Sequence, residues 1–285
     1  MGRIFGMLTG GNRGANLGGL SAIFRDPFYA WEARTYWTWQ RYLVSYLLLA
    51  GVWSGVLDLA MEGLAAAFPV GDAPEVAFAV LALLCRLPLV ALAASATALS
   101  IAPERAAGRL EQLILTPVEP LRLLAARFAA RLKGLALAWV LGAVPLLVGA
   151  ARITDAAAWP GPWTGDPATR SVLLVVAAQV ETAAAVLLAG AVGMYCSARF
   201  ASAIWAQATA LTVSVVALPG LLAVCGCSVG GVFAGVMSGG GPVDYWSVCA
   251  AAVSMATRAT IAGILAWVIW RRAYLRLWAV FYLPQ

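Results

Sequence analysis

Long apolar runs separated by short polar segments dominate the pattern of this chain. Several runs approach or exceed the roughly 18–20 residues that a helix needs to cross a bilayer. The short alternating strands of a membrane β-barrel are absent from the pattern. The sequence therefore predicts an all-α, polytopic membrane protein. Six transmembrane helices are expected, near residues 43–65, 76–101, 132–151, 171–197, 203–225 and 247–270.

The residues before the first apolar run divide into two parts. Residues 1–24 are rich in glycine and are expected to form a flexible cytosolic tail. Residues 25–41 mix aromatic and arginine side chains, which favour the headgroup level and the anionic leaflet, so we expect an interfacial amphipathic elbow helix. Asp26 can cap it and Pro27 suits its first turn. The alternative is that this segment only begins the first span.

Residues 42–285 are expected to form a single six-span transmembrane domain. Between the last two spans, residues 226–246 are rich in glycine and include Gly231, Gly235 and Gly239 at a spacing that lets helices approach closely. A short extracellular re-entrant region fits this pattern, and so does a simple loop.

Basic residues predict the orientation. If the N-terminus is cytosolic, fifteen of the nineteen basic residues fall on the cytosolic side and only Arg152 and Arg170 fall outside. Arg86 and Arg258 are left within spans. Because lysine and arginine accumulate in cytoplasmic loops, the sequence predicts a protein of the cytoplasmic (inner) membrane with both termini in the cytosol.

Composition excludes several kinds of chemistry. The chain is 62% hydrophobic and 11% charged, and it has no histidine, which removes Ser-His-Asp catalysis and histidine-ligated metal sites. Its one lysine, Lys133, does not follow a glycine-rich loop, so the chain has no P-loop of its own. Cys225 and Cys227 are interpreted as small buried side chains, with a soft-metal site or a bond to Cys249 as the alternative.

Residues 103–117 form a charged island between two apolar runs. Pro103 can begin a helix and Pro117 must end one. Between them, Leu110, Leu113 and Ile114 share one face at helical spacing. The pattern predicts a short amphipathic helix at the cytosolic end of the second and third spans. Physical chemistry alone leaves two roles open, a passive surface helix or a contact for a cytosolic partner.

This island resembles the cytosolic loop of type-2 ATP-binding-cassette (ABC) permeases, which are exporter-like membrane subunits. The matching residues are Glu104, Arg105, Gly108, Leu110, Glu111, Leu113, Thr116 and Pro117. Pro120, Leu121 and Arg127 continue the pattern, whereas Ala106 and Arg109 depart from it. Asp26, Pro27 and Glu32 are similar to the family's element before the first span, from which Trp31 departs.

The resemblance implies a function and its partners. Residues 103–117 would be a coupling helix seated in a nucleotide-binding ATPase subunit, which would bind ATP and Mg²⁺, while this chain would bind no cofactor or metal and would not itself be an enzyme. A second permease half, identical or related, would complete the transporter in the lipid bilayer. No nucleic-acid partner is expected, and the cargo is not specified.

Charges within the predicted spans suggest helix contacts. Glu181 and Arg258 lie at matching depths, which predicts an ion pair between them, and Asp58 and Arg86 also lie at compatible depths. Unpaired charges at these depths are costly. Such pairs can lock helices together or line a substrate path, and the first is favoured.

Two other functions compete with the permease. One is a membrane scaffold or channel subunit that has no motor. The other is an intramembrane enzyme built on a carboxylate pair such as Asp58 and Glu181, or on a serine nucleophile. No recognisable catalytic motif supports the enzyme.

Overall fold

A computed structural model describes about half of the chain in detail. The described residues are 29–30, 74–108, 120–144, 146–147, 167–218, 220 and 243–282. Every element in these ranges is helical, which confirms the all-α prediction for this part of the chain. The predicted tail, the first span and residues 226–242 of the predicted re-entrant region lie outside the described residues, whereas residues 243–246 of that region belong to a long helix that runs to Tyr282.

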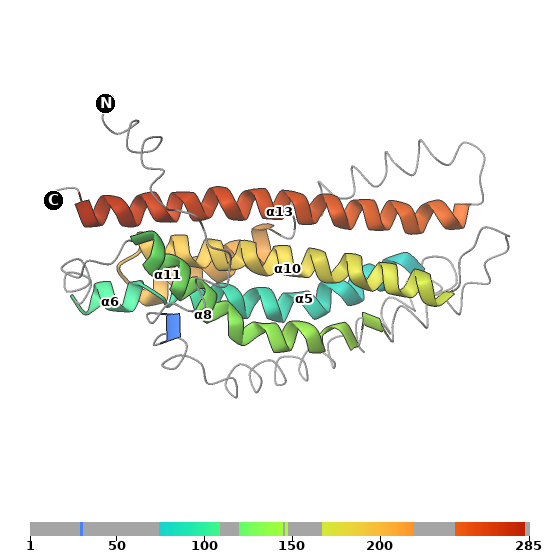
Figure 1. Cartoon of the computed structure of the whole chain (residues 1–285), viewed down its shortest axis with the longest axis horizontal. Coiled ribbons are helices and arrows are strands. Elements are labelled where there is room, and N and C mark those ends of the chain that lie inside the picture. Colours follow the sequence, from blue (N-terminus) through green and yellow to red (C-terminus); the bar gives the residue numbers. More distant parts are fainter. Residues whose placement is uncertain are drawn as a thin grey trace, which may run out of the picture.

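The described helices form an elongated bundle. They are α5 (Pro74–Ala98), α6 (Ala102–Ala106), α8 (Pro120–Leu141), α10 (Pro167–Arg199), α11 (Ala203–Thr212), the π-helical turn η1 (Val213–Ala217) and α13 (Val243–Tyr282). Figure 1 shows α13 running beside α10 along the length of the bundle, with α6 near the end where the chain terminates. We call this the α6 end, and the opposite one the far end.

Prolines mark where several helices begin. Pro74, Pro120 and Pro167 are the first residues of α5, α8 and α10. A proline at the start of a helix leaves no unpaired N–H group, and its backbone angle already suits the helix. At the other end of α10, Arg199 stands in the last turn, where a positive charge is favourable for the helix dipole.

Three helical stretches are long and apolar enough to cross a membrane: Cys85–Ala106, Val175–Arg199 and Val253–Ala279. They correspond to the predicted second, fourth and sixth spans. The predicted third span differs, because its helix α8 already begins at Pro120 and carries Arg122, Arg127, Arg131 and Lys133. The apolar helix at the start of the predicted fifth span, Ala203–Ala217, is shorter than a span in the described part of the chain.

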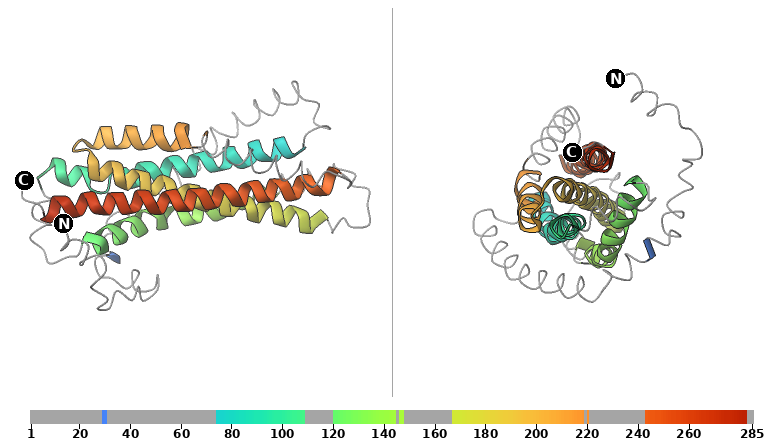
Figure 2. Two further views of the ribbon diagram at one scale, coloured as in Figure 1. Left: turned by 90° about the horizontal axis from the view of Figure 1, so that it is seen from above. Right: turned by 90° about the vertical axis from the view of Figure 1, so that its left-hand side faces the viewer.

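Helix α10 lies at the centre of the bundle. Its most extensive contacts are with α13 and α5, and the end-on view in Figure 2 shows α10 between them. The largest buried cluster joins α5, α10, α11 and α13 and consists mostly of alanine, leucine and valine. Large apolar side chains such as Val176, Leu187 and Trp267 point outward instead, as expected for surfaces that face lipid rather than water.

Small residues let α5 and α10 approach closely. Ala94 and Ala98 on α5 and Ala189 on α10 are buried in the largest cluster. A Cβ atom added at Gly193 would lie 2.5 Å from the carbonyl oxygen of Ala94 and would collide with Thr97 Oγ1. Alanine and glycine at four-residue intervals are typical of tight helix contacts in membranes. Among the described glycines, Gly193 marks the closest approach of one helix to the backbone of another, and Gly231, Gly235 and Gly239 lie outside the described residues.

Enlarging Gly193 should separate α5 from α10. We expect Gly193→Ala to destabilise the protein by about 1–3 kcal/mol, because the added methyl group overlaps backbone and Thr97 atoms. Thermal unfolding in detergent measures the change. Gly263→Ala on α13 is the matched control, since an added Cβ there meets nothing within 4 Å. Equal melting temperatures for the two variants would contradict the close contact.

Candidate functional site

Two groups of polar side chains stand out in the described bundle, one at the α6 end and one nearer its middle. The first surrounds α6 and is called the α6 anchor: Ser100, Glu104, Arg105, Arg127 and Ser197. The second is called the charge triad: Arg86, Glu181 and Arg258. The α6 anchor overlaps the motif on which the family resemblance depends, and the triad contains the charges predicted within the spans.

Helix α6 has only five residues, Ala102–Ala106. Pro103 stands at its beginning and Glu104 in its first turn, as predicted. The helix ends at Ala106, and Gly108 adopts a φ of +67°, a left-handed conformation that glycine reaches readily. The prediction of one unbroken helix over 103–117 is therefore wrong, because the backbone turns at Ala107 and Gly108.

Ser197 of α10 binds the beginning of α6. Its hydroxyl oxygen accepts hydrogen bonds from the backbone N–H groups of Ile101, at 2.7 Å, and Ala102, at 2.9 Å. The first N–H groups of a helix have no partner within the helix. A buried serine from a neighbouring helix supplies that partner here, and it fixes the start of α6 to the last turns of α10.

Arg105 makes a second connection to α10. Its guanidinium donates a hydrogen bond of 2.8 Å to the carbonyl oxygen of Ala198. This carbonyl lies in the last turn of α10, where carbonyl groups lack partners within the helix. The start of α6 is thus bound by a side chain of α10, and the end of α10 is bound by a side chain of α6.

Arg127 of α8 joins α6 from the other side. Only 1% of this residue is exposed. Its guanidinium donates to the carbonyl oxygen of Ser100 at 2.7 Å and to Glu104 Oε1 at 2.7 Å, and it also lies 2.7 Å from Glu104 Oε2. The Oε1 contact is a hydrogen bond, whereas Oε2 lies at ion-pair distance and accepts no hydrogen bond within the described residues. Glu104 is therefore occupied within the chain itself.

The sequence matched these residues to a family motif but did not predict their contacts. Of the motif, Glu104, Arg105 and Gly108 lie in the described residues. Leu110, Glu111, Leu113, Thr116 and Pro117 lie outside them, as do Asp26, Pro27, Trp31 and Glu32 of the predicted elbow. Within that elbow the structure describes Tyr29 and Ala30, which are helical. Tyr29 is buried against Ala126 and Ala130 of α8.

The charge triad joins three helices. Arg86 of α5 forms an ion pair and hydrogen bond with Glu181 Oε1 on α10. Arg258 Nε of α13 lies 3.1 Å from the same oxygen, in ion-pair contact but without the angle of a hydrogen bond. The pair predicted between Glu181 and Arg258 is present. Arg86 also contacts Glu181. Asp58 lies outside the described residues, so its predicted pair with Arg86 stays a prediction.

The triad is largely withdrawn from the surface of the bundle. The side chains of Glu181, Arg86 and Arg258 are 6%, 12% and 17% exposed. One carboxylate thus faces two guanidinium groups, which leaves a formal charge of +1. A buried charge is stable only when it is paired, so Glu181 stabilises both guanidinium groups.

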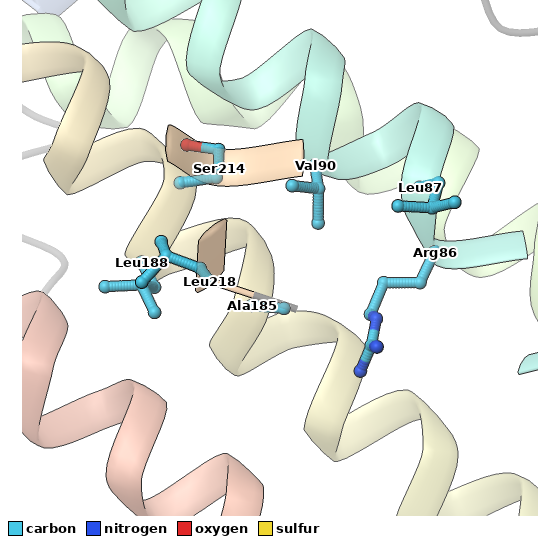
Figure 3. Close-up of a pocket in the computed structure, with 8 residues that line it drawn as sticks. Arg86, Leu87, Val90, Ala185, Leu188, Ser214 and Leu218 are labelled. Carbon is cyan, nitrogen blue, oxygen red and sulfur yellow. The ribbon is translucent and has the colours of Figure 1, made fainter. Parts of the chain in front are cut away.

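A shallow pocket adjoins the triad. Arg86, Leu87 and Val90 of α5 line it together with Ala185 and Leu188 of α10 and with Ser214 and Leu218, which lie in and after the π-helical turn. Figure 3 shows Arg86 reaching from α5 toward α10, with Ser214 and Leu218 on the other side of the pocket. The lining is mainly apolar, with one charged and one hydroxyl side chain.

Ser214 is a functional candidate that the sequence analysis missed. It is 1% exposed, and its hydroxyl has no hydrogen-bond partner in the described part of the structure. It stands in a π-helical turn, a rare form that occurs often at functional sites. A serine within an apolar run gives no periodic signal, so only the structure identifies it.

No metal site is evident in these ranges. Within the described residues, no three acidic or cysteine side chains gather closely enough to hold a metal ion. The two polar groups can fix helices together, bind an anion or transmit movement. Among the described residues, neither group pairs an acid with a base as catalysis would require.

Comparison with known proteins adds no identity. No protein-family model matches the chain, and no curated protein matches it either.

Removing the Ser197 hydroxyl should loosen α6. We expect Ser197→Ala to cost about 1–3 kcal/mol, because two backbone N–H groups lose their acceptor. Hydrogen exchange of the Ile101 and Ala102 amides, followed by mass spectrometry, measures the loosening. Ser202→Ala is the control, since Ser202 makes no side-chain cap with the helix it precedes. Unchanged exchange in Ser197→Ala would contradict the anchor.

Neutralising Arg258 and neutralising Glu181 should change the stability of the protein by different amounts. Arg258→Gln leaves a balanced Arg86–Glu181 pair and should change stability little. Glu181→Gln leaves two buried guanidinium groups without a counter-charge and should cost about 3–5 kcal/mol. Melting temperatures in one detergent compare them. Similar losses in both variants would show that the triad does not depend on its carboxylate.

Proposed function

We propose that this chain is the membrane-spanning permease subunit of an ATP-driven transporter of the ABC type-2, exporter-like class. ATP and Mg²⁺ bind to a separate nucleotide-binding subunit, and a second permease half completes the transport path. The observation that carries the proposal is the attachment of α6, whose charged residues match the family motif, to both α8 and α10.

The attachment suits a part that transmits force. A helix of five residues is too short to be stable alone, yet α6 is held by Ser197 and by the Arg105 bond to Ala198 on one side and by Arg127 on the other. A displacement of α6 would therefore move the ends of α8 and α10 with it. Because α10 packs against both α5 and α13, such a movement would reach the whole described bundle.

Charge distribution supports placing α6 on the cytosolic side. Arg105 lies at the α6 end, together with the arginines of the first half of α8, namely Arg122, Arg127 and Arg131. The C-terminal part of α13 reaches the same end and carries Arg271, Arg272 and Arg276. Basic residues accumulate on the cytoplasmic side of membrane proteins. This orientation presents α6 to a soluble ATPase, with the chain in the cytoplasmic membrane and both termini in the cytosol.

A motor-free scaffold or channel is the competing function, and purification distinguishes the two. The full chain, expressed in its own host and purified in mild detergent, should carry a nucleotide-binding ATPase that mass spectrometry identifies. Photo-crosslinkers placed at Leu110 and Leu113 should reach that ATPase. A chain that crosslinks to no ATPase from these positions would overturn the proposal in favour of the scaffold or channel.

Weakening the anchor should uncouple the ATPase from the permease. We expect Arg105→Ala to reduce stimulated ATP hydrolysis by about tenfold, in the range of typical coupling energies, while the chain still reaches the membrane and binds the ATPase. Arg199→Ala is the matched control, because Arg199 is exposed and, within the described residues, donates its hydrogen bond to Tyr195 on its own helix. Full stimulation in Arg105→Ala would contradict a role for the anchor.

A further inference from the structure

The C-terminal part of α13 exposes a face that changes from apolar to basic. Trp267 and Val268 are 61% and 41% exposed. One turn further along the helix Arg271 and Arg272 are exposed, and Arg276 follows after another turn. Side chains three or four residues apart are neighbours on a helix surface. These five residues therefore form one continuous surface, which we call the α13 stripe.

The three arginines of the α13 stripe carry charge that the described residues do not neutralise. None of them forms an ion pair with a described residue. Arg271 lies over the ring of Trp267 instead, with its guanidinium carbon 5.7 Å from the ring centroid. No aspartate or glutamate occurs between residues 245 and 285. Three positive charges within about 7.5 Å of helix length thus have no counter-charge on their own part of the chain.

Aromatic side chains indicate that this part of α13 lies at a membrane surface. Trp267, Trp270, Tyr274 and Trp278 occupy the same turns as the arginines. Tryptophan and tyrosine are enriched at the headgroup level of bilayers. Arginine at that level places its charged end among headgroups while its stem stays beside apolar surface. The stripe therefore passes from the acyl-chain region into the headgroup region within two helical turns.

The order of the side chains favours a lipid over a soluble partner. A soluble acidic protein would neutralise the arginines but would leave Trp267 and Val268 uncovered, as well as Ile264 one turn earlier, which is 58% exposed. An anionic lipid carries both complementary parts in one molecule. Its phosphate suits guanidinium groups, which bind phosphate through paired hydrogen bonds, and its acyl chain suits the apolar part of the stripe.

We infer that the α13 stripe binds an anionic membrane lipid. Arg271 and Arg272 contact the phosphate of the headgroup, and Arg276 adds positive charge one turn further out. The first carbons of the acyl chain lie against Trp267 and Val268. This binding goes beyond the proposed transport function and requires no ATPase partner, so it stands or falls separately from that function.

Lipid binding to the purified full chain tests the stripe. The probe is phosphatidylglycerol, compared with phosphatidylcholine of the same acyl chains, titrated in detergent and followed by native mass spectrometry. The wild type should bind phosphatidylglycerol preferentially. Arg272→Gln should weaken that binding about fivefold, and Arg271→Gln combined with Arg272→Gln about thirtyfold. Both arginines are exposed, so the variants should keep the melting temperature of the wild type.

Arg199→Gln is the matched control. It removes the same charge from an exposed position in the last turn of α10, at the same end of the bundle. It should leave phosphatidylglycerol binding within about twofold of the wild type, because exposed charges that do not touch the ligand are screened. Equal weakening in Arg199→Gln and Arg272→Gln would show attraction to the whole basic end and would overturn the site. Equal binding in the wild type and the double variant would overturn it as well.

Two further arms distinguish the source of the anion. Inorganic phosphate should not compete with phosphatidylglycerol, because a free anion gains nothing from Trp267 and Val268. Competition at comparable concentration would mean that the stripe takes a free anion, and the lipid proposal would be wrong. The double variant is also purified from its own host. If it binds phosphatidylglycerol as the wild type does but loses a protein that the wild type retains, the stripe is a protein interface and the lipid proposal fails.

Discussion

The close contact between α5 and α10 is the constraint on which the rest of the described structure depends. With Gly193 against the backbone at Ala94, the two helix axes are held at a separation that larger side chains would not permit. The two polar groups lie to either side of this contact, along the same two helices. Toward one end it brings Ser197 to the start of α6, and toward the other it brings Arg86 to Glu181.

The contact also explains why polar side chains are tolerated inside so apolar a bundle. In a membrane, polar groups must find partners within the protein, since lipid offers none. Around α6 that condition is met by pairing each helix end with a side chain from a neighbouring helix. In the triad it is met only in part. Both groups keep buried polar atoms without a hydrogen-bond partner within the described residues, such as Glu104 Oε2 and Arg105 Nη2 near α6 and Arg258 Nε in the triad.

Sequence patterns predicted the parts of this architecture that depend on length and composition. Apolar runs located the α5, α10 and α13 spans, and equal depth identified Glu181 and Arg258 as partners. The patterns failed where a single residue decides the outcome. Residues 103–117 have helical spacing, but Gly108 turns the backbone and ends α6 early.

Partners that depend on how each helix is rotated could not be read from the sequence. Ser197 and Ser214 are both isolated serines in apolar runs, and nothing in their local sequence distinguishes one that is satisfied from one that is not. Arg127 matched only a basic position in a motif, yet it is almost completely buried and forms an ion pair with Glu104 of the α6 anchor. Arg86 was matched by depth to Asp58, which lies outside the described residues, and its contact with Glu181 depends on a helix rotation that the sequence does not reveal.

The length of α13 has a mechanical consequence. With 40 residues it measures about 60 Å, whereas a bilayer with its headgroups is about 40–45 Å thick. Such a rod must either lean or emerge into water. Because it is straight and packs mainly on α10, leaning by about 10° would swing its tips by roughly 5 Å each in opposite senses. A small rotation near the membrane centre would thus be amplified on both surfaces at once.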